Sequence, residues 1–149
     1  MVREDLLNKE LFGGTCSPTA SMRTLKYFLS DAAKHTARVH QIYFIGAFLQ
    51  AKVNKRVFLN LDSRYADFFL LYAKYFGSAL ILLKSVYGMT NSGKLFSDEL
   101  TEWLLEAGFI QSQCQMSIYY KYAPDGSKTV VFSYVDDCVY WYTSKALGK

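Results

Sequence analysis

Apolar residues recur at helical spacing in two stretches of the chain. The first stretch follows Ser17-Pro18, which is expected to cap it, and predicts a helix that ends near residue 34 or 35. The second begins at Asn91 or Ser92 and predicts a helix over about residues 92–107 that packs under a sheet, with Gly108 at its end and its acidic residues toward solvent. The two stripes consist of Met22, Leu25, Phe28, Leu29 and Ala32, and of Phe96, Leu100, Trp103, Leu104 and Ala107.

Shorter apolar segments predict strands. A Pro-Asp-Gly turn at 124–127 joins two of them, because proline fixes φ and glycine supplies a positive φ. Residues 1–16 show no periodicity, 46–49 are expected to leave a strand through a turn, and 62–78 are ambiguous between helix and loop. The order of elements predicts an α+β fold, an antiparallel sheet with helices packed on one face. The expected strands are residues 39–44, 57–61, 79–83, 117–123, 129–134 and 138–142.

Composition excludes several classes of protein. A length of 149 residues indicates one domain, and 51% hydrophobic residues support a packed core rather than a disordered chain. No uncharged apolar run reaches the ~18 residues that suggest a spanning helix, and the first residues lack the apolar segment of a signal peptide. The three cysteines stand far apart, which argues against a disulfide scaffold or a zinc knuckle and fits a reducing compartment.

Charge is distributed unevenly along the chain. Residues 1–75 carry 11 Lys and Arg against 6 Asp and Glu, whereas residues 76–149 carry 6 against 7. A basic first half suits a polyanionic partner such as nucleic acid. The alternative interpretation is an ordinary solvated surface.

An acidic pair interrupts the apolar residues of the last two predicted strands. A tight turn at Val135-Asp136 would present Asp136 and Asp137 at the tip of a hairpin. Carboxylate oxygens are the ligands that Mg²⁺ prefers, and a two-metal site can clamp the attacking and leaving oxygens of a phosphoryl displacement. The alternative is an ordinary acidic turn that binds no ion.

This acidic pair belongs to an ordered set of motifs. Tyr134-Val135-Asp136-Asp137 is the hallmark of reverse transcriptases, and Gly46-Ala47-Phe48-Leu49-Gln50-Ala51 and Leu83-Lys84-Ser85-Val86-Tyr87-Gly88-Met89 precede it. Residues 17–26 open the first helix. The set, in this order, resembles the reverse transcriptase domain of Ty1/copia-type retrotransposons. The resemblance covers roughly residues 16–149 and leaves residues 1–15 as an unmatched lead-in.

The resemblance implies a polymerase palm with part of the fingers and RNA-directed DNA polymerase activity. Two Mg²⁺ ions, or Mn²⁺ in their place, would bind Asp136, Asp137 and the backbone carbonyl of Phe44. The implied partners are an RNA or DNA primer-template and deoxynucleoside triphosphates, with no membrane. The rest of a Pol polyprotein, including a thumb, is expected to be missing from this chain, and an intracellular location in the cytoplasm or nucleus is expected.

One position departs from the family pattern. The family places a third catalytic Asp four residues before the Ala of its AFL motif, which corresponds to Ala47, and residue 43 is a tyrosine. A phenol has a pKa near 10 and is neutral at pH 7. Its presence would leave the cations under-neutralised and badly placed, so we expect this copy to polymerise poorly or not at all. Asp31 and Asp62 are the nearest acids in sequence, and we do not expect either to replace it.

Three further residues match the nucleotide-binding positions of the family, namely Phe48, Tyr87 and Gly88. Phe48 matches a bulky residue beneath the sugar, although core packing accounts for it equally well. Gly88 matches a glycine near the templating base pair, and its alternative is a turn glycine that needs a positive φ. Two alternatives for the whole chain stay open, a nucleic-acid-binding remnant without catalysis and a structural module with an incidental acidic turn.

Overall fold

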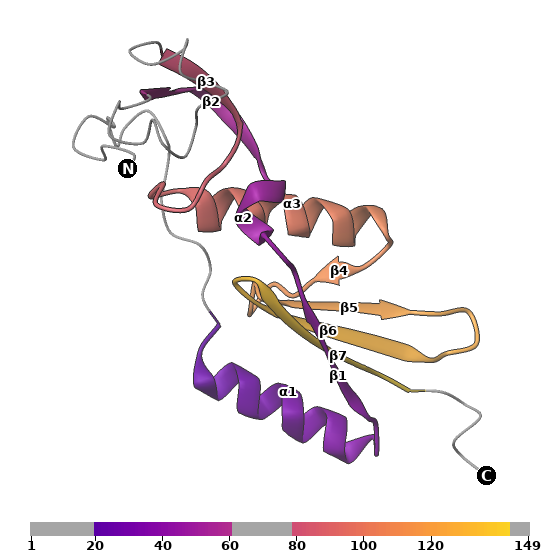
Figure 1. Cartoon of the computed structure of the whole chain (residues 1–149). Coiled ribbons are helices and arrows are strands. Elements are labelled where there is room, and N and C mark those ends of the chain that lie inside the picture. Colours follow the sequence, from indigo (N-terminus) through magenta and orange to yellow (C-terminus); the bar gives the residue numbers. More distant parts are fainter. Residues whose placement is uncertain (1–19, 61–78, 144–149) are drawn as a thin grey trace.

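A computed structural model describes residues 20–60 and 79–143 of the chain (Figure 1). An antiparallel sheet in the order β1-β7-β6-β5-β4 forms its centre, and β2 and β3 pair separately as a two-stranded antiparallel sheet. The helices are α1 (Met22–Lys34), α2 (Ala47–Gln50) and α3 (Ser92–Glu106). The strands are β1 (Val39–Tyr43), β2 (Lys52–Asn60), β3 (Ala79–Lys84), β4 (Ile110–Gln111), β5 (Ile118–Tyr122), β6 (Lys128–Tyr134) and β7 (Asp137–Tyr142).

The five-stranded sheet is apolar on both faces, and a helix covers each of them. Along β6, Val130 and Phe132 join the buried cluster of α1, whereas Val131 joins that of α3, because successive side chains of a strand point to opposite faces. Figure 1 shows α3 and α1 on opposite sides of the sheet. The predicted α+β class with an antiparallel sheet is confirmed. The expectation that the helices share one face is wrong, because Val130, Val131 and Phe132 are all buried.

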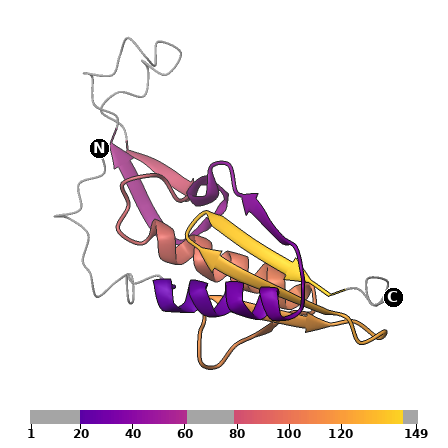
Figure 2. The ribbon, with the colours of Figure 1, turned by 90° about the horizontal axis from the view of Figure 1, so that it is seen from below.

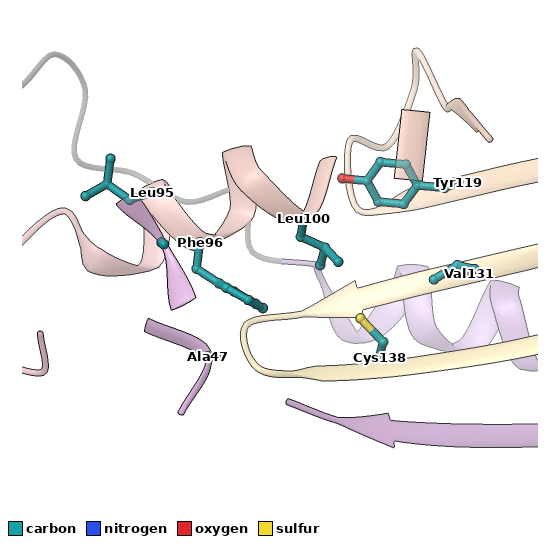
Figure 3. Close-up of a cluster of buried hydrophobic side chains, with 8 residues drawn as sticks. Ala47, Leu95, Phe96, Leu100, Tyr119, Val131 and Cys138 are labelled. Atoms are coloured by element: carbon teal, nitrogen blue, oxygen red, sulfur yellow. The ribbon is translucent and has the colours of Figure 1, made fainter. Parts of the chain in front are cut away.

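The cluster on the α3 side fills the space between that helix and the hairpin of β6 and β7. Phe96 and Leu100 of α3 meet Tyr119, Val131 and Cys138 of the sheet (Figure 3). On the other side, α1 buries its apolar residues in a second cluster. That cluster contains Ala20, Phe28, Ala32, Val130, Phe132 and Trp141.

The helix ends differ in how well the sequence predicts them. The expected start of α1 at Ser17 is wrong, since Ser21 is the N-cap and its side-chain oxygen accepts a hydrogen bond from the backbone N–H of Thr24 at 3.1 Å. The end of α3 is confirmed, because Gly108 follows it with a φ of +84°. Residues 1–16 and 62–78 lie outside the described residues.

Several details of the other elements correct the sequence prediction. Residues 47–50 form the one-turn helix α2 rather than a simple turn, and β2 begins at Lys52 rather than at residue 57. The sequence prediction missed β4, whose two residues are too few to show a periodicity. Trp103 is 39% exposed and does not pack under the sheet as expected. Glu99 does not simply face solvent, because it accepts a hydrogen bond from the backbone N–H of Lys52 at 3.0 Å.

None of the helices in residues 20–60 and 79–143 has the length and apolar character needed to cross a membrane.

Candidate functional site

The acidic pair lies at the tip of the β6–β7 hairpin. Tyr134 at the end of β6 is paired with Asp137 at the start of β7, so the loop consists of Val135 and Asp136 alone. Val135 has a φ of +54°, which a β-branched residue adopts at a steric cost. A positive φ at Val135 and none at Asp136 is the pattern of a type II′ turn, whose twist matches that of the flanking strands. This turn presents the acidic pair at the edge of the structured core.

The strand β1 brings Tyr43 to the acidic pair. β1 runs antiparallel to β7 with Tyr43 directly opposite Asp137, and the backbone N–H of Phe44 donates to the carbonyl of Asp136 at 2.9 Å. Residues directly opposite each other in a sheet point to the same face, so Tyr43 and Asp137 lie on one face of the hairpin tip. Tyr43 is 58% exposed there. The structure therefore brings together three of the residues that the sequence analysis singled out, although they are far apart in the chain.

The phenol of Tyr43 stays protonated at neutral pH. The negative charge of Asp136 raises the pKa of Tyr43 above its ordinary value, and partial desolvation, Tyr87, a hydrogen bond with Asp136 and the charge of Asp137 act in the same direction. At pH 7 the phenol consequently contributes a hydroxyl group and no negative charge. The local charge thus comes from the two carboxylates alone.

A side chain that the sequence analysis missed contacts Asp137. The side-chain amide of Gln41 donates a hydrogen bond through Nε2 to Oδ1 of Asp137 at 2.9 Å. Gln41 lies two residues before Tyr43 in β1, so both point to the same face of the sheet. This period of two could have identified Gln41 once β1 was known to pair with β7. The amide occupies part of the carboxylate that a cation would otherwise use.

Phe48 and Tyr87 lie together beside this tip. Their ring centroids are 5.2 Å apart, and Phe48 packs partly against the cluster under α3, as its core-packing interpretation requires. Two buried serines hold the backbone here. The hydroxyl of Ser85 donates to the carbonyl of Phe48, and that of Ser92 donates to the carbonyl of Val86 at 2.7 Å. These contacts fix the segment that carries Tyr87.

Gly88 follows Tyr87 in a conformation that favours glycine. Its φ is +90°, and no heavy atom lies within 4 Å of the place where a Cβ would stand. The requirement for glycine is therefore conformational, which matches the interpretation of Gly88 as a turn residue. The space beside it is open.

The residues at the tip do not match a site for two metal ions held by three carboxylates. Within residues 20–60 and 79–143, no group of three or more His, Cys, Asp or Glu side chains is arranged to hold a metal ion. The carbonyl of Phe44, the expected backbone ligand, accepts a hydrogen bond from the N–H of Ala47 at 3.2 Å. Asp31 pairs with Lys128 at 3.3 Å, at the end of β6 away from the tip, and Asp62 lies outside the described residues.

Comparison with protein-family models assigns the chain to a family. The model described as reverse transcriptase (RNA-dependent DNA polymerase) matches residues 6–147. The chain belongs to the reverse transcriptase family. No curated protein and no solved structure matches it. Reverse transcriptases act on a nucleic acid template and deoxynucleoside triphosphates with divalent metal ions. The matched region includes the acidic hairpin, Tyr43 and the Phe48–Tyr87 pair.

Proposed function

We propose that the chain is the palm and part of the fingers of a Ty1/copia-type RNA-directed DNA polymerase, and that this copy does not polymerise. The five-stranded sheet with α1 and α3 would be the palm, and the β2–β3 sheet would belong to the fingers. The observation that carries the proposal is the position of Tyr43 directly opposite Asp137 and beside Asp136. This register supports the interpretation of residue 43 as the position that a third carboxylate would occupy beside the acidic pair.

The loss of activity follows from the charge at the tip. Phosphoryl transfer depends on electrostatic stabilisation and accurate positioning, so a missing ligand weakens both. Asp136 and Asp137 supply two negative charges, while the raised pKa of Tyr43 keeps its phenol neutral. The hydrogen bond from Gln41 further reduces the capacity of Asp137 to bind a cation. Divalent ions would therefore bind weakly and without the geometry that the reaction needs.

The remaining residues at the tip are suited to contact a nucleic acid end. Phe48 and Tyr87 form an aromatic pair beside the acidic hairpin, and Tyr87 is 57% exposed. Aromatic faces bind sugars and bases without sequence preference. We infer that this chain still binds the end of a primer-template, although it does not catalyse polymerisation.

Substitution at residue 43 tests the proposal. We expect Tyr43→Asp to bind Mn²⁺ more than about tenfold tighter than the unchanged chain, corresponding to about 1.4 kcal/mol, as measured by the electron paramagnetic resonance signal of free Mn²⁺. Extension of a DNA primer on an RNA template should appear with Tyr43→Asp alone. Tyr43→Asn is the matched control, because it removes the ring as Asp does but brings no charge.

Two results would contradict the proposal. Primer extension by the unchanged chain would show that another ligand completes the site. Equal Mn²⁺ affinity of Tyr43→Asp and Tyr43→Asn would show that residue 43 does not face the metal position.

A further inference from the structure

The helix α1 carries cations and an aromatic ring on its solvent-exposed side. Arg23, Tyr27 and Lys34 stand at positions i, i+4 and i+11, which lie on one face of a helix. All three are exposed, and Tyr27 is 67% exposed. Figure 2, seen from the α1 side, shows the helix lying along the five-stranded sheet. The buried residues Thr24, Phe28 and Ala32 face that sheet, so the basic face is turned outward.

A surface pocket lies between this face of α1 and strand β5. It has a volume of about 220 Å³, and Tyr27 of α1, Tyr120 and Tyr122 of β5, and Lys128 of β6 are among its lining residues. The rings of Tyr120 and Tyr122 are 6.0 Å apart, and Tyr122 is 60% exposed. Sites for whole small molecules start at about 300 Å³, so this pocket suits one flat group of a longer ligand.

The charge around the pocket favours a polyanion. Asp31, the acidic side chain that lines it, is neutralised by Lys128 at 3.3 Å and has His35 at 3.8 Å. In the part of the chain that the structure describes, no ion pair engages Arg23 or Lys34. Asp125, on the turn between β5 and β6, accepts hydrogen bonds from the backbone and side chain of Ser127. The outer face of α1 is therefore free to attract negative charge.

We propose that the pocket between α1 and β5 is a binding site for single-stranded nucleic acid. A base would stack on the exposed rings of Tyr27 and Tyr122, while Arg23 and Lys34 would contact phosphates on either side. Stacking on aromatic side chains tolerates every base, and cations along the strand make such binding sensitive to salt. Aromatic rings in the pocket, with exposed cations on the adjoining face of α1, fit this ligand better than an apolar protein surface.

This site is separate from the acidic hairpin. It lies at the Lys128 end of β6, and this strand of seven residues spans about 20 Å between that end and the tip. The proposal therefore goes beyond the polymerase function and does not depend on catalysis. A strand bound here would be held along the outside of the palm.

Fluorescence anisotropy with a labelled oligo-dT of about 12 nucleotides, in buffer without divalent ions, tests the site on the full chain. Changing Tyr27 and Tyr122 together to Ala should weaken binding by about tenfold or more, whereas changing both to Phe should preserve it, because stacking needs the ring alone. Tyr142→Ala is the matched control. This tyrosine is 46% exposed, and it follows Trp141 of the α1-side cluster, so it points to the opposite face.

Salt dependence provides a second measurement. Changing Arg23 and Lys34 to Gln should lower the slope of log affinity against log salt by about 0.7 for each phosphate contact removed. Arg23 and Lys34 are exposed, so we expect the fold to tolerate their substitution. The salt measurement therefore still tests the site if the variant with Tyr27 and Tyr122 both changed to Ala fails to fold.

Several outcomes would overturn the site. They are no binding of the oligonucleotide by the unchanged chain, an equal loss with Tyr142→Ala, or an unchanged salt slope in the Arg23 and Lys34 variants. The assay contains no metal ion and alters no residue of the acidic hairpin. Its failure is therefore distinguishable from failure of the polymerase proposal.

Discussion

Cys138 shows how strongly neighbouring residues of one strand can differ. It follows Asp137 directly, yet its side chain points to the opposite face and is 3% exposed within the α3-side cluster. Burial, and then the charge of Asp137, raise the pKa of Cys138 from 9.0 to about 12. The thiol is neutral at every pH at which the fold is ordinarily studied, and it acts as a packing residue.

The raised pKa predicts slow alkylation of Cys138. Thiolate is the reactive form of cysteine. Because the pKa of Cys138 is about 12, its thiolate fraction stays small until the pH approaches that value. At a pH of about 8.5, where an ordinary thiol is half ionised, we expect iodoacetamide to modify Cys138 at least about 100-fold more slowly than an exposed cysteine. Cys114 is exposed and serves as the internal standard in a mass-spectrometric time course. Equal rates at Cys114 and Cys138 would contradict the burial described here.

At the scale of the element, the β6–β7 hairpin contains a residue in an unfavourable conformation. Val135 adopts a φ of +54°, and the left-handed region costs an L-residue about 1–2 kcal/mol. We expect Val135→Gly to raise the free energy of unfolding by about 1 kcal/mol, because glycine adopts a positive φ without a steric penalty. Urea unfolding followed by circular dichroism measures the change.

A strand valine provides the control for this substitution. Val39 lies in β1, is 41% exposed and is not among the residues with a positive φ. Val39→Gly should lower the free energy of unfolding by about 0.5–1 kcal/mol, because glycine loses more backbone entropy than other residues. Destabilisation by both substitutions would show that the turn does not strain Val135.

The sequence predicts elements well where their signal is local. The apolar spacing of α1 and α3 identifies both helices, and the Pro-Asp-Gly turn identifies the hairpin of β5 and β6. The start of α1 is predicted wrongly at Ser17, because Ser21 is the residue that accepts the capping hydrogen bond from the backbone N–H of Thr24. The covering of both sheet faces depends on which strands are neighbours, although the consecutive apolar residues of β6 already indicate a strand buried on both sides.

The candidate site can be predicted only in part from the sequence, because its geometry also depends on which strands are neighbours in the sheet. Motif spacing singles out Tyr43, Asp136 and Asp137, but their proximity depends on the pairing of β1 with β7. The role of Gln41 depends on that register as well, so no local pattern marks it. The serines that hold Phe48 and Val86 are found through contacts that their hydroxyls make across the fold.

At the scale of the whole molecule, the sheet separates two clusters of buried side chains. Phe28 is 1% exposed between α1 and the sheet, with its ring 5.6 Å from that of Phe132. Phe28→Ala should lower the free energy of unfolding by about 3–5 kcal/mol, because it removes a buried ring and leaves a cavity. Small domains are stable by about 5–15 kcal/mol, so urea unfolding should show a large shift of the midpoint.

The matched control lies on the other helix. Trp103 belongs to the apolar stripe of α3 but is 39% exposed. Trp103→Ala should therefore cost less than about 1 kcal/mol, although the side chain is larger. A greater cost for Trp103→Ala than for Phe28→Ala would contradict the arrangement of the two clusters.

The pairing of β1 with β7 also sets the order in which the molecule can form during synthesis. Gln41 and Asp137 are 96 residues apart in the chain and meet through one hydrogen bond. The hairpins of β4 to β7 join strands that are neighbours in sequence. By contrast, β1 can pair only after β7 has been synthesised and has left the ribosome. Long-range pairing of this kind slows folding, because the entropy of closing the loop comes before the contacts that reward it. The site formed by Tyr43 and the acidic pair is therefore among the last parts of a newly made chain to fold.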